Sequence, residues 1–130
     1  MKVVLDTHAL YHAVDSPGEL TAAGRSAVED PANELLISAI TAWKFGLHAQ
    51  HGKIEFAGGV DRWVDAALTS LGVRVVPVDV SIVRQTFKLA GFDRRDPADR
   101  IVVATALVED AVLVTRDEWM VRWTGVRTVW

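Results

Sequence analysis

Four aspartates stand at positions from which they could act together on one substrate. Asp6 and Asp117 each follow a short apolar run, and Asp96 and Asp99 flank the start of an apolar segment. Carboxylates that lie close together repel one another, and their usual compensation is a divalent cation. Hard oxygen ligands suit Mg²⁺ or Mn²⁺, which lower the pKa of a bound water and orient it at a phosphate. The pattern is therefore typical of a metal-dependent nuclease.

These acids also have a simpler explanation. Asp is a favoured residue at helix N-caps, so Asp6 could do no more than begin the helix that follows it. The two interpretations differ in whether other strands deliver acids to the same place. No other catalytic pattern competes: His8 and His12 lie one helical turn apart but have no carboxylate at the spacing of a zinc site. We interpret both histidines as packing or surface residues.

Apolar runs alternate with helical patterns along the chain. Apolar runs predict strands at residues 3–5, 35–37, 73–78 and 112–114, and a short last strand at 126–130. Helical spacing predicts helices over residues 7–14, 21–29, 39–47, 60–71, 81–89, 98–108 and 119–123. This alternation predicts an α/β fold with a parallel sheet covered on both faces. Parallel strands end at one edge of the sheet, so we expect Asp6, Ser38 and Asp117 at that edge, where such sheets bind ligands.

Length and composition narrow the class of protein. A chain of 130 residues is long enough for one domain with its own core, spanning residues 1–130. The absence of cysteine excludes disulfides and thiolate metal sites. Acidic residues outnumber basic ones by 17 to 14, which leaves room only for a local basic patch. We find no signal peptide and no apolar stretch of about 18 residues, and so expect a cytoplasmic protein without membrane contact.

Four blocks of the sequence together resemble the PIN domain, and more narrowly the PIN-domain ribonuclease toxins of VapC type, which are encoded beside an antitoxin. The blocks are LDTHAL, ISAITAW, RRDPADRIVVATAL and LVTRD. The resemblance implies a three-layer α/β/α fold with a central parallel sheet, cleavage of RNA that depends on Mg²⁺ (or Mn²⁺), homodimers, and inhibition by a VapB-type antitoxin. It also implies that Asp6, Asp99 and Asp117 are the metal-site acids, with Asp96 as the first aspartate of its block.

The chain departs from this family at Lys44. In the family, the tryptophan that ends the ISAITAW block is usually followed by a glutamate of the acidic site. Lysine has no acceptor and is positively charged, so a Lys44 that points inward would pair with Asp6 or Asp99 and lower the metal affinity. Three explanations stay open. Lys44 is an inactivating substitution, or it marks a natural member with weakened or lost cleavage that still binds RNA or antitoxin, or Asp96 supplies the missing ligand.

Arginines beside the acids are candidates for contact with RNA, because guanidinium groups bind phosphate in bidentate fashion. The candidates are Arg94, Arg95, Arg100 and Arg116. For Arg100 and Arg116 the alternative is that they only balance the neighbouring aspartates.

The tryptophans fall into two groups. Trp43 and Trp63 have helical neighbours and are expected in the core. Trp119 and Trp123 are candidates for a dimer or antitoxin surface, with burial over the end of the sheet as the alternative.

Two other functions fit parts of the pattern. A catalytically inactive PIN-like module would bind RNA or antitoxin without cleavage. A receiver-like signalling domain also combines a parallel sheet with an acidic magnesium site, but it expects adjacent acids after the first strand, where this chain has Asp6 alone.

Overall fold

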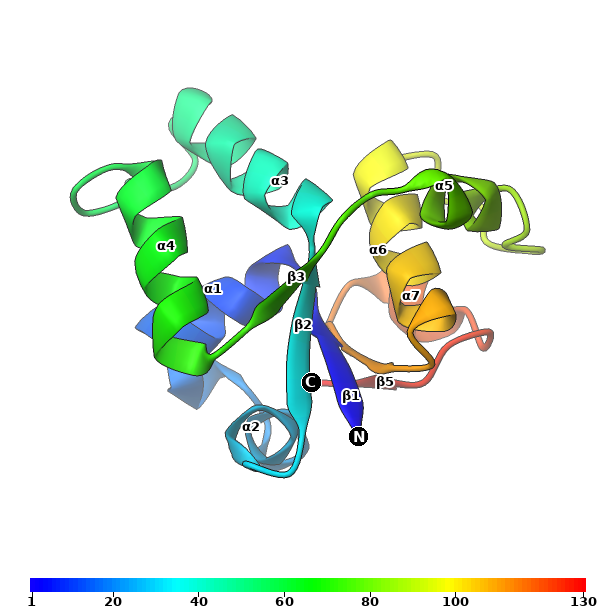
Figure 1. Ribbon diagram of the computed structural model, residues 1–130, viewed down its shortest axis with the longest axis horizontal. Helices are drawn as coiled ribbons and strands as arrows, with labels where there is room; N and C mark the ends of the chain where they lie inside the picture. Colours follow the sequence, from blue (N-terminus) through cyan, green and yellow to red (C-terminus); the bar gives the residue numbers. More distant parts are fainter.

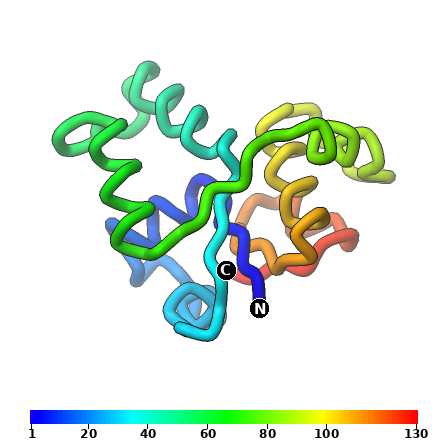
Figure 2. The backbone as a smooth tube through the Cα atoms, viewed as in Figure 1, coloured from blue at the N-terminus to red at the C-terminus, as the bar shows by residue number.

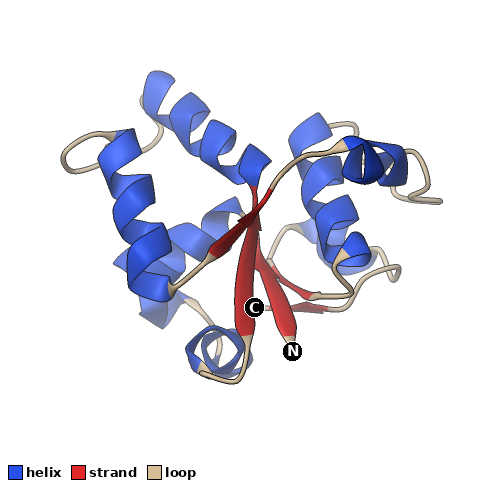
Figure 3. Cartoon of the chain, in the orientation of Figure 1, coloured by secondary structure: helices blue, strands red, loops and turns tan.

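In the computed structural model, which describes residues 1–130, the chain folds into a five-stranded parallel sheet that lies between helices (Figures 1 and 3). Its elements in chain order are β1 (Lys2–Leu5), α1 (Thr7–Asp15), the 3-10 helix η1 (Pro17–Glu19), α2 (Ala22–Glu29), β2 (Glu34–Ser38), α3 (Ala39–Gln50), α4 (Val60–Leu71), β3 (Arg74–Val76), α5 (Val80–Thr86), α6 (Pro97–Val108), β4 (Val112–Val114), α7 (Glu118–Arg122) and β5 (Thr128–Val129). The predicted α/β fold with a parallel sheet is confirmed.

The order of the strands in the sheet is β3-β2-β1-β4-β5, and every pair is parallel. The chain builds outward from β1 to β3, crosses the sheet to α5 (Figure 2), and then places β4 on the other side of β1. The direction of winding therefore reverses between β1 and β4, and open α/β sheets bind ligands beyond the strand ends at such a point. Receiver domains have the order 2-1-3-4-5, so the receiver-like alternative is wrong.

The core has one layer on each face of the sheet, because side chains of a strand alternate between its faces. Val3 and Leu5 face the layer formed with α1, α3 and α4, where Phe45 and Trp63 are buried. Val4 faces the opposite layer, which is formed mainly with α6. None of the helices is both long and apolar enough to cross a membrane.

Some of the predicted element boundaries, and the predicted burial of one tryptophan, were wrong. The strand predicted at 73–78 is only Arg74–Val76, because Pro77 has no N–H to give to the ladder. The helix predicted to reach residue 89 ends at Thr86. Trp43 is 56% exposed rather than in the core, because α3 turns the flanking Thr41 and Phe45 inward. The other tryptophan expected in the core, Trp63, is buried.

Candidate metal centre

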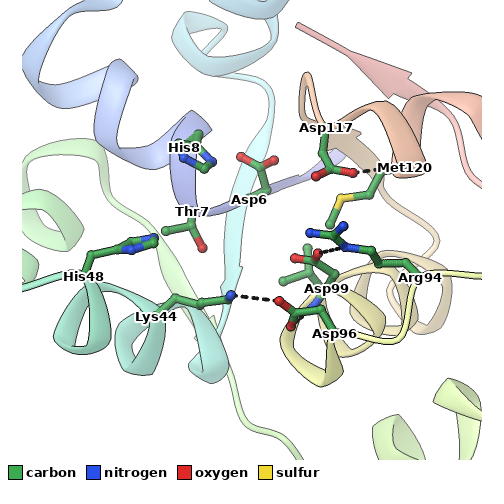
Figure 4. Close-up of a pocket in the computed structure, with 11 residues that line it drawn as sticks. Asp6, Thr7, His8, Lys44, His48, Arg94, Asp96, Asp99, Asp117 and Met120 are labelled. Carbon is green, nitrogen blue, oxygen red and sulfur yellow. Dashed lines mark hydrogen bonds and ion pairs between the residues drawn. The ribbon is translucent and has the colours of Figure 1, made fainter. Parts of the chain in front are cut away.

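One polar pocket at the ends of β1 and β4 brings together all four aspartates that the sequence singles out (Figure 4). The pocket holds about 210 Å³. Its lining comes from segments that are far apart in the sequence: Asp6, Thr7, His8, Lys44, His48, Arg94, Asp96, Asp99, Val102, Asp117 and Met120. Only two of these eleven residues are hydrophobic, so the pocket suits a charged ligand better than an apolar one.

Asp6 is the most deeply buried of the four carboxylates, at 5% exposure. It is the N-cap of α1, accepting a hydrogen bond from the Ala9 backbone N–H at 2.7 Å, and its other oxygen accepts from the hydroxyl of Thr115. Burial raises the pKa of Asp6, the charge of Asp117 raises it further, and the two hydrogen bonds offset only part of the rise. Asp6 therefore caps a helix with one oxygen while its carboxylate lies in the pocket, so the two interpretations of Asp6 are compatible.

Sequence reasoning missed the role of Thr115. In the parallel pair of β1 and β4, Leu5 lies beside Val114, so the next residue of each strand, Asp6 and Thr115, meets its counterpart just beyond the sheet. Once the two strands are known to be neighbours, the contact follows from their register. The sequence contained both residues but not the pairing.

Asp117 is held by backbone groups. Its Oδ1 accepts hydrogen bonds from the N–H groups of Trp119 and Met120, at 3.0 and 3.2 Å, which makes it the N-cap of α7. Its own N–H donates to the Thr115 hydroxyl at 3.0 Å. Thr115 thus connects Asp6 to Asp117 and fixes the two acids relative to each other.

Lys44 points into the pocket, but its partner is neither of the two acids expected from the sequence. Its Nζ lies 3.0 Å from Oδ2 of Asp96, so the prediction that it pairs with Asp6 or Asp99 was wrong. The reason is that Asp96 caps α6, using Oδ1 for the N–H groups of Ala98 and Asp99, and α6 packs against α3. Although partial burial opposes it, the Lys44 hydrogen bond holds the pKa of Asp96 below its ordinary value.

Asp99 lies in the first turn of α6 and has its own cationic partner. Nε of Arg94 donates to Oδ2 of Asp99 at 2.9 Å. Burial nevertheless raises the pKa of Asp99, and the charges of Asp96 and Asp117 add to the rise. The negative charge of the pocket therefore exceeds what Lys44 and Arg94 compensate.

The carboxylates of the pocket are suitable ligands for a divalent cation, but their side chains are not arranged around a common point. No three His, Asp or Glu side chains are close enough together to hold one metal ion. Mg²⁺ is, however, usually bound through one or two carboxylates while keeping several waters. Burial raises the pKa of Asp6 and of Asp99, and a divalent cation beside them would offset the cost of their negative charge. Lys44 and Arg94 are the groups with which it would compete for oxygen atoms.

Two histidines, His8 and His48, also line the pocket, and the sequence did not predict them there. The rings of His8 and His48 are 6.2 Å apart between centroids, and both side chains lie on the Lys44 side of the pocket (Figure 4). Burial lowers the pKa of His48, as do the nearby charges of His8 and Lys44. The available indication was spacing, since His48 is one helical turn from Lys44 and so shares its face of α3.

The four candidate arginines differ in how they are held. Arg94 is the one that lines the pocket. Arg100 donates hydrogen bonds to three backbone carbonyls, those of Thr86, Phe92 and Arg94, at 2.7 to 3.0 Å, which gives it a structural role in the loop before α6. Arg116 lies over the ring of Trp130 at 4.8 Å, and Arg95 is exposed. Contact of these arginines with RNA stays a prediction.

The fold and the acidic pocket define a class of protein, and comparisons with known proteins agree. The PIN domain family matches residues 3–123 of the chain. Ribonuclease VapC22 of Mycobacterium tuberculosis is 32% identical over 115 residues, which covers 88% of this chain and 86% of that protein.

Solved structures share the fold over almost the whole chain. VapBC2 from Rickettsia felis, bound to a promoter DNA fragment, superposes with a TM-score of 0.75 at 15% identity and covers 98% of this chain and 97% of that one. VapBC-1 from nontypeable Haemophilus influenzae gives a TM-score of 0.69 at 22% identity, covering 98% and 96%. The chain belongs to the PIN domain family. Within it, the chain is a member of the VapC family of VapBC toxin–antitoxin systems.

Proposed function

We propose that this chain is a metal-dependent endoribonuclease toxin that uses Mg²⁺ or Mn²⁺ and whose cleavage of RNA is weakened by Lys44. The observation that carries the proposal is the single pocket lined by Asp6, Asp99 and Asp117, which come from three distant segments. Membership of the VapC-type toxins supports the ribonuclease activity. Solved neighbours include the two VapBC structures and a toxin-antitoxin complex from Klebsiella pneumoniae, which support a VapB-type antitoxin as partner. The homodimer implied by the family stays a prediction.

Asp6, Asp99 and Asp117 are the proposed metal ligands, with Asp96 in a secondary role. When bound, the ion would lower the pKa of a water and stabilise negative charge on the phosphate. The protein orients the ligands itself: Thr115 and the start of α1 hold Asp6, and the start of α7 holds Asp117. Arg94, beside Asp99, is placed to donate hydrogen bonds to a phosphate of the substrate.

Lys44 lowers the metal affinity in this proposal. Its ammonium group introduces a fixed positive charge into the pocket and occupies Oδ2 of Asp96. An arriving cation therefore meets repulsion and has one acceptor fewer. This weakens the idea that Asp96 replaces the missing glutamate, because both of its oxygens are already engaged.

The same ion pair favours a second candidate function. If Lys44 and Arg94 compensate enough charge for the pocket to be stable without a metal, the chain is a catalytically inactive PIN-like module that binds RNA or antitoxin. The two functions predict different results when Lys44 is changed.

The test is cleavage of total bacterial RNA by the wild-type protein and by Lys44→Glu, with Mg²⁺, with Mn²⁺ and with EDTA. The control is Lys53→Glu, which makes the same charge change at an exposed residue outside the pocket. We expect Lys44→Glu to cleave faster than wild type and Lys53→Glu to match wild type, with no cleavage in EDTA. Equal rates for wild type and Lys44→Glu would remove Lys44 from the mechanism. No cleavage by either would leave the inactive module as the function.

A further inference from the structure

An exposed tryptophan flanked by two arginines lies immediately beside the acidic pocket. Trp119 is in the first turn of α7, two residues after Asp117, and it is 40% exposed. The guanidinium carbon of Arg94 is 5.8 Å from the centre of its ring, and that of Arg122 is 5.9 Å from it. A large aromatic surface is thus combined with two positive charges.

Trp119 borders a second hollow of about 210 Å³, whose wall includes Phe92, Arg122 and Trp123. Trp123 is fixed there, because its indole N–H donates to the carbonyl of Ala90 at 2.9 Å and its ring packs on Phe92. Trp119 has no such hydrogen bond. One tryptophan therefore builds the hollow, while the other presents a face to it.

Arg94 lies between the acidic pocket, which it lines, and Trp119, which borders the hollow. Its Nε holds Asp99 in the pocket while its guanidinium group lies over Trp119 (Figure 4 shows the Arg94 end of this connection). A phosphodiester at the acids would therefore have Arg94 next to it and Trp119 just beyond. Arg122 makes only a loose pair with Glu118, at 3.9 Å, with both side chains largely exposed, so little holds it in place.

We propose that Trp119, Arg94 and Arg122 form a subsite for one unpaired nucleobase of the RNA, adjacent to the phosphodiester at the acidic pocket. The inference rests on the proposed function, because it takes RNA as the substrate. Unpaired bases stack on aromatic rings and guanidinium planes whatever their sequence, and arginines contact the neighbouring phosphates. A base inside a double helix has no free face for the ring, so the subsite directs the enzyme to single-stranded segments and loops.

The position of this surface beside the acidic pocket favours RNA over an acidic protein segment as the occupant. Arg94 extends directly from the pocket in which the phosphodiester has to lie, so the surface continues the path of the nucleic-acid backbone. Positive charge that follows such a path is the electrostatic footprint of a nucleic-acid site. An antitoxin contact at Trp119 is the competing outcome, and the experiment separates the two.

The experiment measures the Kd of a short fluorescein-labelled oligouridylate by fluorescence anisotropy in EDTA, where metal-dependent cleavage cannot proceed. Trp119→Ala should raise the Kd by about 5- to 150-fold, the range for loss of one base–aromatic stack. Trp119→Phe should restore most of the affinity. Trp43→Ala is the matched control, since Trp43 is exposed to 56% on α3 and does not line the pocket. It should bind like wild type.

A second probe isolates the base from the phosphates. Wild type and Trp119→Ala should bind an abasic oligonucleotide of the same length and charge with equal Kd, because no base is present to stack. Arg122→Gln should reduce the salt dependence of oligouridylate binding by about one phosphate contact, which tests the surface without touching the ring.

The outcomes separate this inference from the proposed function. Circular dichroism first shows that Trp119→Ala is folded. If this variant then binds oligouridylate with the same Kd as wild type, the base subsite is wrong. A contact of Trp119 with the antitoxin would not change that conclusion. Equal rates of RNA cleavage by wild type and Trp119→Ala would also contradict the base subsite, while leaving the proposed function intact. Failure of both wild type and Lys44→Glu to cleave any RNA overturns the proposed function instead.

Discussion

The two sides of the acidic pocket hold their carboxylates by different means. On the strand side, Asp6 and Asp117 accept hydrogen bonds from helix N-termini and, for Asp6, from Thr115, all of which are neutral groups. On the helix side, Asp96 and Asp99 are paired with the cations Lys44 and Arg94. The strand side therefore keeps negative charge that the protein orients without neutralising, whereas the helix side supplies positive charge of its own.

The difference separates the groups that are fixed by the fold from the groups that set the charge of the pocket. Asp6 is fixed by the register of β1 against β4, which Lys44 does not touch. Lys44 acts only on the far wall of the pocket, where it uses an acceptor of Asp96. We therefore expect changes on the strand side to affect catalysis and stability together, and changes at Lys44 to affect mainly the affinity for cations.

The largest effect is expected from Asp6→Asn. Changes to residues around metal ligands cost 10- to 100-fold in affinity or activity, so loss of a ligand's charge should reduce cleavage by more than about a hundredfold. The measurement is the cleavage rate with Mg²⁺ in the Lys44→Glu background, where activity is expected to be highest. Cleavage that persists at the parent rate would take Asp6 out of the site.

The same variant should be more stable than wild type. Because the pKa of Asp6 is raised by folding, its ionised form opposes folding once the pH exceeds that raised value. The free energy of unfolding of the wild type therefore falls as the pH rises through the folded pKa of Asp6. At low pH Asp6 is protonated in both the folded and the unfolded protein, so wild type and variant should be equally stable. Asn also caps helices well. We expect Asp6→Asn to gain about 1 kcal/mol in free energy of unfolding at neutral pH, by urea denaturation, and nothing at acidic pH.

Lys44→Glu should change the helix side from cationic to acidic. Removing the repulsion and restoring an acceptor should tighten Mg²⁺ binding by about tenfold or more, which corresponds to about 1.4 kcal/mol. Isothermal titration calorimetry measures this directly, with Lys53→Glu as the control for net charge. A gain of the same size in both variants would mean that general electrostatics, and not the pocket, is responsible.

Thr115→Val tests the neutral hydrogen bonds of the strand side. The buried carboxylate of Asp6 would lose one donor, at a cost of about 1–3 kcal/mol in free energy of unfolding at neutral pH. The cost should shrink in acid, where Asp6 is protonated. Thr105→Val is the matched control, since this buried hydroxyl bonds only to the Ile101 carbonyl of its own helix. Equal losses in both variants would contradict a special link between Thr115 and Asp6.

Lys44→Met should have the smallest effect, a rise in the pKa of Asp96. The Lys44 hydrogen bond and charge hold that pKa below its ordinary value, so their removal lets it return upward. Carbon-detected NMR titration of the Asp96 carboxyl measures the change. An unchanged pKa would show that the ion pair does not form in solution.

The sequence predicted the elements better than their contacts. The runs around Val4, Leu36 and Leu113 are apolar on both faces, which is typical of a parallel sheet covered on both sides, and each is a strand. The same logic put Asp6 and Asp117 at one edge, since residues after parallel strands share it. The helix predicted over residues 98–108 was also correct, beginning in the structure one residue earlier at Pro97, which suits a first turn because the first N–H groups of a helix are unused.

What the sequence could not supply was the choice among neighbouring side chains. The sequence did not determine which acid pairs with Lys44, because its partner depends on how α3 packs against α6. The predicted burial of Trp43 was wrong for a similar reason, because the orientation of α3 decides which of its residues face the core, and these are Thr41 and Phe45. The role of Thr115 needed the strand order, which periodicity does not contain.

The most direct test of the central claim is paramagnetic broadening by Mn²⁺ in amide NMR spectra of the wild type and Lys44→Glu. We expect the first amide signals to disappear to be those of Asp99, Asp117 and Thr7, the neighbour of Asp6. They should disappear at a lower Mn²⁺ concentration in Lys44→Glu than in wild type. Broadening that is centred elsewhere, or that is identical in the two proteins, would contradict a cation site in this pocket with Lys44 as its competitor.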